Sequence, residues 1–118
     1  MRTIPLFVLS ILCVGSSLPA LAQDFPYNRN ASLQVGQSIV LKGVRSADCS
    51  LTEAPSWKRV SSQLPQTKLG RFSDGGVGTV NSNQCKGRVA ARAVRFTATH
   101  AGQEQFTILE DSFTIAVR

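Results

Sequence analysis

Few residues of this chain combine the type and spacing that catalysis requires. The single histidine, His100, precedes Ala101 and Gly102 in a segment with the composition of a turn. Because Ser/His/Asp catalysis needs a histidine held by an acid and directed at a nucleophile, we expect His100 to be an exposed loop residue. Glu110 and Asp111 are adjacent in another turn, so their carboxylates should point apart instead of flanking one bond. The sequence therefore predicts no enzyme and no catalytic residue.

The glycine and cysteine patterns also lack a cofactor or metal signature. Residues 75–78 are rich in glycine, but no Lys-Ser or Lys-Thr pair follows as it does in a phosphate-binding loop. A structural zinc site takes about four ligands, whereas the chain offers one histidine and cysteines only at Cys13, Cys49 and Cys85. We expect neither a cofactor nor a metal.

A group of basic residues gives the strongest indication of a binding surface. Lys86, Arg88, Arg92 and Arg95 lie close together in a chain with a formal net charge of +6. Such a surface attracts anionic partners, for example an acidic polysaccharide, lipid headgroups or an acidic protein. The alternative is a solvated strand face that keeps the protein soluble. Nucleic acid is not favoured, because single strands are bound by several stacking aromatics and the chain has one tryptophan.

The N-terminal residues have the layout of a secretory signal peptide. Arg2 supplies a positive charge, the segment from Ile4 to Leu18 is mostly apolar, and Ala20 and Ala22 are small residues at a cleavage site. The apolar run is shorter than the roughly 20 residues of a membrane span, although an uncleaved anchor is the alternative. We predict a leader over residues 1–22, cleavage after Ala22, and a secreted or periplasmic protein with no transmembrane segment after cleavage.

Export determines how the remaining cysteines are interpreted. Cys13 falls inside the leader, so the predicted mature chain retains two cysteines, Cys49 and Cys85. An even number in an exported protein predicts a disulfide, and closing this loop contributes about 4 kcal/mol in the chain-entropy model. A reactive or metal-binding thiol pair is the alternative. Asn30 begins an N-glycosylation sequon, whose use depends on the host.

The segments after the leader alternate with the period of β-strands. Residues 31–43 predict either a hairpin or two sequential strands, and residues 102–117 predict a hairpin whose apolar side chains share one face. Trp57 to Val60 and Leu69 to Phe72 are expected as short strands, with Trp57 in the core. Ser73 to Gly76 is expected as a turn before another strand at 77–80.

The longest predicted strand covers residues 89–99 and contains a conflict of phase. Val94 and Phe96 alternate in one phase, whereas Ala93 belongs to the other, so Ala93 and Val94 would both point inward. A β-bulge near Ala93 would reconcile the two phases and direct Arg88, Arg92 and Arg95 to solvent. About seven short strands predict a single all-β domain over residues 23–118, a β-sandwich with a small closed barrel as the alternative.

The C-terminal third resembles the last strands of bacterial immunoglobulin-like domains, through Val94 to Ala98, Phe106 to Ile108 and Phe113 to Val117. This resemblance implies an immunoglobulin-like sandwich that acts as a binding or interaction module. Leu33 to Leu41 is also similar to the opening strands of chagasin-like inhibitors of papain-type cysteine proteases. That resemblance implies three inhibitory loops, of which Gly76-Val77-Gly78 matches the second, while the first and third motifs are missing.

Overall fold

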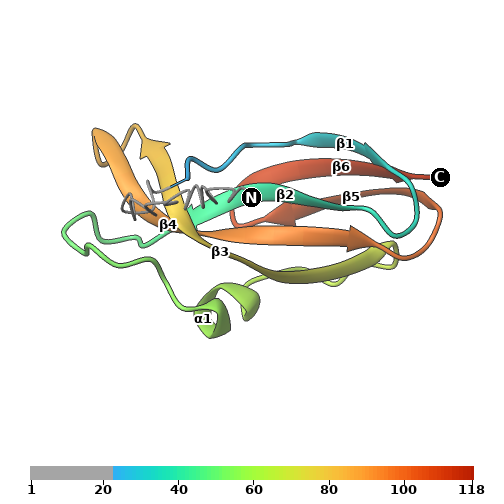
Figure 1. Ribbon diagram of the computed structural model, residues 1–118, viewed down its shortest axis with the longest axis horizontal. Coiled ribbons are helices and arrows are strands. Elements are labelled where there is room, and N and C mark those ends of the chain that lie inside the picture. Colours follow the sequence, from blue (N-terminus) through green and yellow to red (C-terminus); the bar gives the residue numbers. More distant parts are fainter. Residues whose placement is uncertain (1–22) are drawn as a thin grey trace, which may run out of the picture.

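The computed structural model describes residues 23–118, and the predicted leader lies outside the described residues. Two three-stranded sheets with the orders β1-β6-β5 and β2-β4-β3 make up the described part of the chain (Figure 1). The elements are β1 (Asn30–Leu33), β2 (Ser38–Arg45), α1 (Trp57–Ser61), β3 (Gly70–Ser82), β4 (Gly87–Ala98), β5 (Gly102–Ile108) and β6 (Asp111–Val117). The predicted all-β sandwich is confirmed, with an isolated bridge between Asp24 and Thr79 beside the six strands.

One hydrophobic core lies between the two sheets. Phe96 of β4 packs against Phe72 of β3 and Phe106 of β5, with ring centroids 5.7 and 6.0 Å apart, and Phe106 in turn packs against Phe113 of β6 at 6.4 Å. These rings join both sheets into one layer of side chains, which defines a sandwich. The strands expected at the C-terminus supply this core in the predicted phase, since Phe106, Ile108, Phe113, Ile115 and Val117 are all buried.

The first two strands do not form a hairpin. β1 pairs in parallel with β6, from Asn30 opposite Thr114 to Leu33 opposite Val117. β2 pairs antiparallel with β4 in the other sheet. Of the two arrangements that the sequence allows for residues 31–43, the structure therefore has two sequential strands, and the chain crosses between the sheets after Leu33.

The phase conflict in the long strand is resolved by its neighbours. The register of β2 shifts between Val40 and Lys42, and that of β3 shifts between Asp74 and Val77. Both irregularities lie opposite Ala93 and Val94, while β4 itself continues without an inserted residue. A bulge is thus present at the predicted level, but in the flanking strands. Ser73 to Gly76, expected to be a turn, belongs to one continuous strand β3.

The segment around the tryptophan is helical, which corrects the predicted strand at residues 57–60. α1 begins after Ser56, whose hydroxyl accepts a hydrogen bond from the backbone N–H of Arg59 at 3.2 Å. A serine at this position satisfies a donor that the first helical turn leaves unpaired. Val60 is buried in the core, and Trp57 is partly buried against it, as expected for a core residue. The helix therefore presents its apolar side chains to the core between the sheets.

Beyond the bulges, residues 77–92 of β3 and β4 continue as a hairpin arm that bends away from the sandwich (Figure 1). The loop over residues 46–56 runs beside it, and a disulfide joins Cys49 of this loop to Cys85 at the tip of the arm, with the Cα atoms 5.5 Å apart. The predicted pairing of these two cysteines is confirmed. We call residues 46–56 the clamped loop.

The segment that leads into β1 covers part of the arm. The backbone N–H of Phe25 donates to the carbonyl of Thr79 at 2.9 Å, and the N–H of Thr79 donates to the carbonyl of Gln23 at 2.8 Å. The ring of Phe25 occupies space that side chains at Gly43 and Gly78 would need, since a Cβ at Gly78 would lie 2.7 Å from that ring. The glycines therefore form a socket for an aromatic side chain.

Candidate functional site

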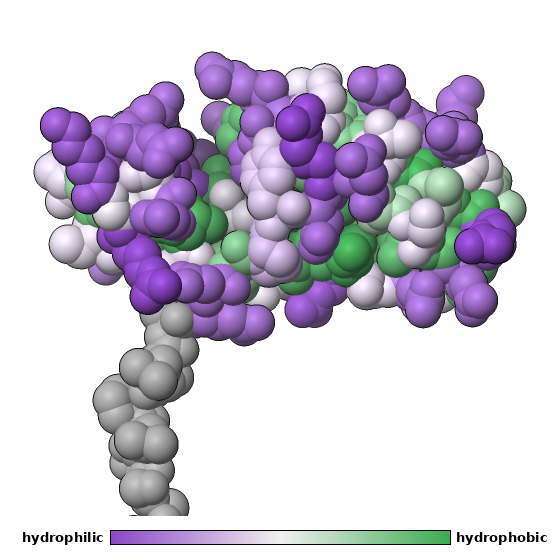
Figure 2. Space-filling model, turned by 90° about the horizontal axis from the view of Figure 1, so that it is seen from above, coloured by the Kyte–Doolittle hydropathy of each residue, from purple (hydrophilic) through white to green (hydrophobic). Residues whose placement is uncertain are grey.

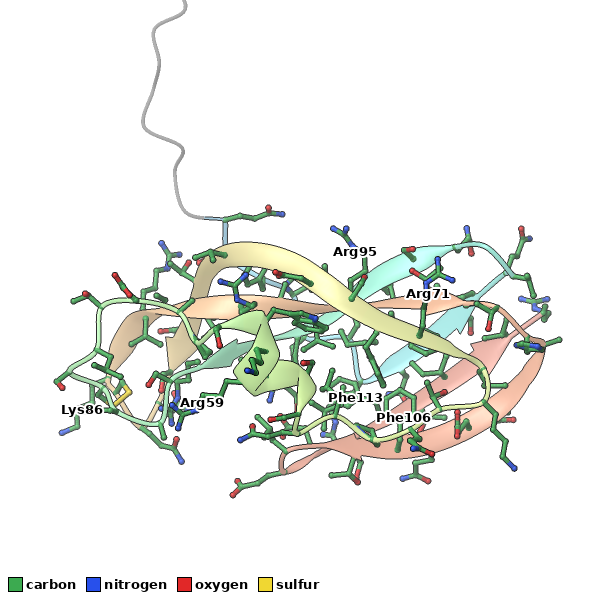
Figure 3. All side chains as sticks on the ribbon, turned by 90° about the horizontal axis from the view of Figure 1, so that it is seen from below. Arg59, Arg71, Lys86, Arg95, Phe106 and Phe113 are labelled. Carbon is green, nitrogen blue, oxygen red and sulfur yellow. A yellow bond between two sulfur atoms is a disulfide. The ribbon has the colours of Figure 1, made fainter. Side chains whose placement is uncertain are left out.

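The structure does not bring the four predicted basic residues into one patch. Arg88, on the arm, forms an exposed ion pair with Asp24 at 2.6 Å. Lys86 lies at the tip of the arm beside the disulfide, far from Arg95 on the body of the sandwich (Figure 3). Closeness in sequence placed these residues along a long strand, so their side chains are spread over its length and over both of its faces.

Arg92 does not project into solvent, which corrects the expectation for this residue. Its Nε donates to the carbonyl of Pro55 at 2.7 Å, and its Nη1 donates to the Asp74 carboxylate at 2.8 Å. The side chain is mostly buried and connects the clamped loop to β3. Burial raises the pKa of Asp74, but hydrogen bonds from Gly76 and Arg92 outweigh it and leave this pKa below its ordinary value. Arg92 is therefore a structural residue.

A different pair of arginines lies on the outward face of the β2-β4-β3 sheet. Arg71 of β3 is opposite Thr97 of β4, and Arg95 of β4 is opposite Ser73 of β3. Cross-strand partners share a face, so the two arginines are diagonal neighbours, with Cβ atoms about 7–8 Å apart in this arrangement. Both are exposed, and both point away from the core rings of Phe106 and Phe113 (Figure 3).

Hydroxyl groups surround these arginines. Ser38 of β2 is opposite Thr97, and their hydroxyl oxygens are 2.7 Å apart. Neither arginine is within ion-pair distance of a carboxylate in the described part of the chain, where the three ion pairs use other basic residues. We call the surface formed by Ser38, Arg71, Ser73, Arg95 and Thr97 the arginine face. Sequence analysis missed Arg71, although its alternation with the inward Phe72 was a usable signal.

The residues considered for catalysis occupy separate surroundings. His100 is exposed in the turn before β5, with its Nδ1 2.8 Å from the hydroxyl of Thr99. Asp111 is held by Lys42, whose Nζ lies 2.5 Å from its carboxylate, while Glu110 is exposed. Burial raises the pKa of Asp111, but the hydrogen bond and charge of Lys42 help to bring it below its ordinary value. In residues 23–118 no group of three or more His, Cys, Asp or Glu side chains could hold a metal ion.

A broad hollow of about 1270 Å³ opens at the same end of the sandwich as the arm. It is lined by Phe25 to Tyr27, the end of β2, the clamped loop, residues 81–84 of the arm and the β5–β6 turn at Leu109 to Asp111. We call this hollow the loop notch. The arm that forms one of its walls stands at the left of the molecule in Figure 2.

The segments that carry the inhibitor resemblance are only partly brought together. Residues 54–56, before Trp57, and Leu109 to Asp111 both border the loop notch. Gly76-Val77-Gly78, expected in a loop, instead lies within β3, with Gly78 buried against Phe25.

Comparison with protein-family models, with curated proteins and with solved structures found no match to this chain. The structure of residues 23–118 contains no helix long and apolar enough to cross a membrane. The function must therefore be argued from the arginine face and the loop notch themselves.

Proposed function

We propose that this protein is an exported, non-catalytic binding module that engages an anionic envelope or extracellular polymer through the arginine face. The observation that carries this proposal is the diagonal pair of Arg71 and Arg95, both exposed and neither in an ion pair. The sequence of the leader supports export. The proposal keeps one of the four residues suggested by sequence, Arg95, and replaces the others.

The chemistry of guanidinium groups favours such a partner. Each presents a planar fork of donors that matches a carboxylate, sulfate or phosphate group. Two forks at this spacing can meet successive anionic groups of one polymer, while the hydroxyls of Ser38 and Thr97 supply further donors. The net charge of +6 adds long-range attraction to a polyanion.

The strand order supports the proposed likeness to immunoglobulin-like domains. In those sandwiches strands B, E and D are neighbours in one sheet, and F and G are neighbours in the other. The orders β2-β4-β3 and β6-β5 correspond to these groups. Between β2 and β3, where the third strand of that plan is expected, this chain has the clamped loop and α1.

Heparin affinity chromatography tests the arginine face. The double variant Arg71→Ala/Arg95→Ala should leave a heparin column at clearly lower salt than the wild type, because two phosphate-like or sulfate-like contacts are lost and the salt dependence of binding weakens with each. The protein is prepared by expressing the full chain with export and purifying the product from the periplasm.

The matched control is Arg59→Ala/Lys86→Ala, which removes the same charge from exposed positions outside the arginine face. It should elute close to the wild type. Equal losses in both double variants would show that net charge alone governs retention, and the arginine face would then have no special role.

The alternative function, inhibition of papain-type cysteine proteases, has one supporting observation, because two of its three matched segments border the loop notch. Inhibition of papain by nanomolar protein would favour it over the proposed polymer binding. Full papain activity in the presence of micromolar protein would exclude it.

A further inference from the structure

Exposed apolar side chains concentrate at the loop notch. Five large hydrophobic residues of the described chain are exposed, and three of them line this hollow: Tyr27, Leu51 and Leu109, at 50, 53 and 43% exposure. They come from three different segments, the lead-in to β1, the clamped loop and the β5–β6 turn. Single exposed hydrophobics are common, but a group around one concavity marks an interaction site.

The backbone at this end is held in an uncommon conformation. Among residues 23–118, only Lys86 and Leu109 have a positive φ without being glycine, each at 57°. This region is unfavourable for a bulky side chain such as leucine, and strain of this kind is concentrated at functional sites. At Leu109 the strained backbone presents an apolar side chain to the notch.

The disulfide makes the notch a pre-organised surface. It joins the clamped loop, which carries Leu51, to the tip of the arm beside Lys86. A loop that is already ordered loses less conformational entropy when a partner binds. Arg92 holds the other end of the clamped loop through the carbonyl of Pro55.

The charges of the notch are balanced, unlike those of the arginine face. Lys42 and Asp111 neutralise each other. Of the remaining charged lining residues, Arg45 and Arg59 are basic, and Glu53 and Glu110 are acidic. A polyanion gains little from such a lining, whereas a polypeptide brings apolar side chains, backbone amides and charges of both signs. The volume of about 1270 Å³ also exceeds the roughly 300–1,000 Å³ of small-molecule pockets.

We propose that the loop notch is a docking site for an extended segment of a partner protein. An apolar side chain of that segment packs between Tyr27, Leu51 and Leu109, and Arg59 and Glu110 meet polar groups on either side. This site is independent of the arginine face, and either surface can act without the other.

A random-peptide library displayed on phage is the probe, selected against the exported protein purified from the periplasm. The selected peptides should converge on a motif with an apolar anchor. Leu109→Asn should weaken their binding by about tenfold or more, the loss of roughly 1.4 kcal/mol that removes one anchor contact. Asparagine tolerates a positive φ, so this variant removes the apolar group and preserves the fold of the turn.

Val35→Ser is the matched control, because Val35 is as exposed as Leu51 but does not line the notch. It should bind the selected peptide as the wild type does. Backbone NMR signals that move on peptide addition should belong to the clamped loop, residues 81–84 and the β5–β6 turn. The proposal is overturned if no motif emerges, if the signals that move lie elsewhere, or if Leu109→Asn binds like the wild type.

Discussion

At the scale of single residues, the arginines of β4 show how one residue type serves different roles on the same strand. Arg92 is mostly buried with a carboxylate and a carbonyl as partners, Arg88 is exposed in an ion pair, and Arg95 is exposed without one. The sequence gives all three the same chemistry. Their partners, Pro55, Asp74 and Asp24, are distant in sequence, so the differences arise only from the tertiary structure.

Arg92→Ala should therefore lower stability instead of polymer binding. Removal of this side chain leaves the Pro55 carbonyl and the Asp74 carboxylate without their donor, and hydrogen bonds to charged groups contribute about 1.5–3 kcal/mol. Urea unfolding followed by fluorescence of the single tryptophan would measure the change. Arg88→Ala is the comparison, because an exposed ion pair contributes about 0–1 kcal/mol. Equal stability of the two variants would contradict a structural role for Arg92.

At the scale of elements, close contacts of glycines position the arm. Gly78 of β3 has the carbonyl oxygen of Gln23 and the ring of Phe25 directly above it, so a Cβ there would lie 2.3 Å from that oxygen. Gly76, in the bulge of the same strand, has open space around the corresponding position and a φ of 95°. The first glycine is required by packing and the second by backbone conformation.

Gly78→Ala should displace the Gln23–Phe25 segment and destabilise the protein by more than Gly76→Ala. Overpacked interiors typically lose about 1–3 kcal/mol, whereas an alanine at a positive φ loses about 1 kcal/mol. Thermal unfolding of both variants gives the comparison, and hydrogen exchange at Thr79 reports the loss of its bond to Gln23. If Gly78→Ala were as stable as the wild type, the lead-in segment would not occupy this socket in solution.

The success of sequence analysis at this scale depends on the range of the signals. Phe106 to Val117 alternates over two strands joined by a short turn, and both strands are present as expected. Trp57 to Val60 is too short for periodicity to distinguish a strand from a helix, and the cap at Ser56 was the signal that it missed. Gly75 and Gly76 have turn composition, yet only the pairing with β4 shows that they form a bulge inside β3.

The candidate site was harder to anticipate than the fold. The disulfide followed from composition and compartment, and Arg95 followed from alternation. The loop notch could not be anticipated, because Tyr27, Leu51 and Leu109 come from segments that only the folded sandwich brings to one end. Local patterns describe which face of a strand a residue occupies, but they do not identify which distant segment lies across from it.

At the scale of the whole molecule, the two outer faces differ in charge. The outward positions of the β1-β6-β5 sheet carry no charged residue: Asn30, Ser32, Gln103, Gln105, Thr107, Ser112, Thr114 and Ala116. The opposite sheet carries the arginine face. Such an asymmetric distribution orients a molecule as it approaches a charged partner, so a polyanion should meet the β2-β4-β3 side first.

The disulfide should contribute to the stability of the whole domain and of the notch in particular. Cys49→Ser/Cys85→Ser should lower the free energy of unfolding by about 4 kcal/mol in the chain-entropy model, measured by urea titration against the oxidised wild type. The phage-selected peptide should also bind more weakly, because the clamped loop is no longer fixed. Unchanged stability would show that the bridge does not constrain the unfolded chain as this model requires.

The parallel pairing of β1 with β6 has a mechanical consequence. Gln23 and Arg118 leave the sandwich at opposite ends, and the adjacent strands β1 and β6 run in the same direction between them. Tension applied across these two residues would pull the strands past each other along their length. All the hydrogen bonds of the pair would then bear the load together instead of opening one after another. A domain built in this way is suited to withstand stretching between two attachment points.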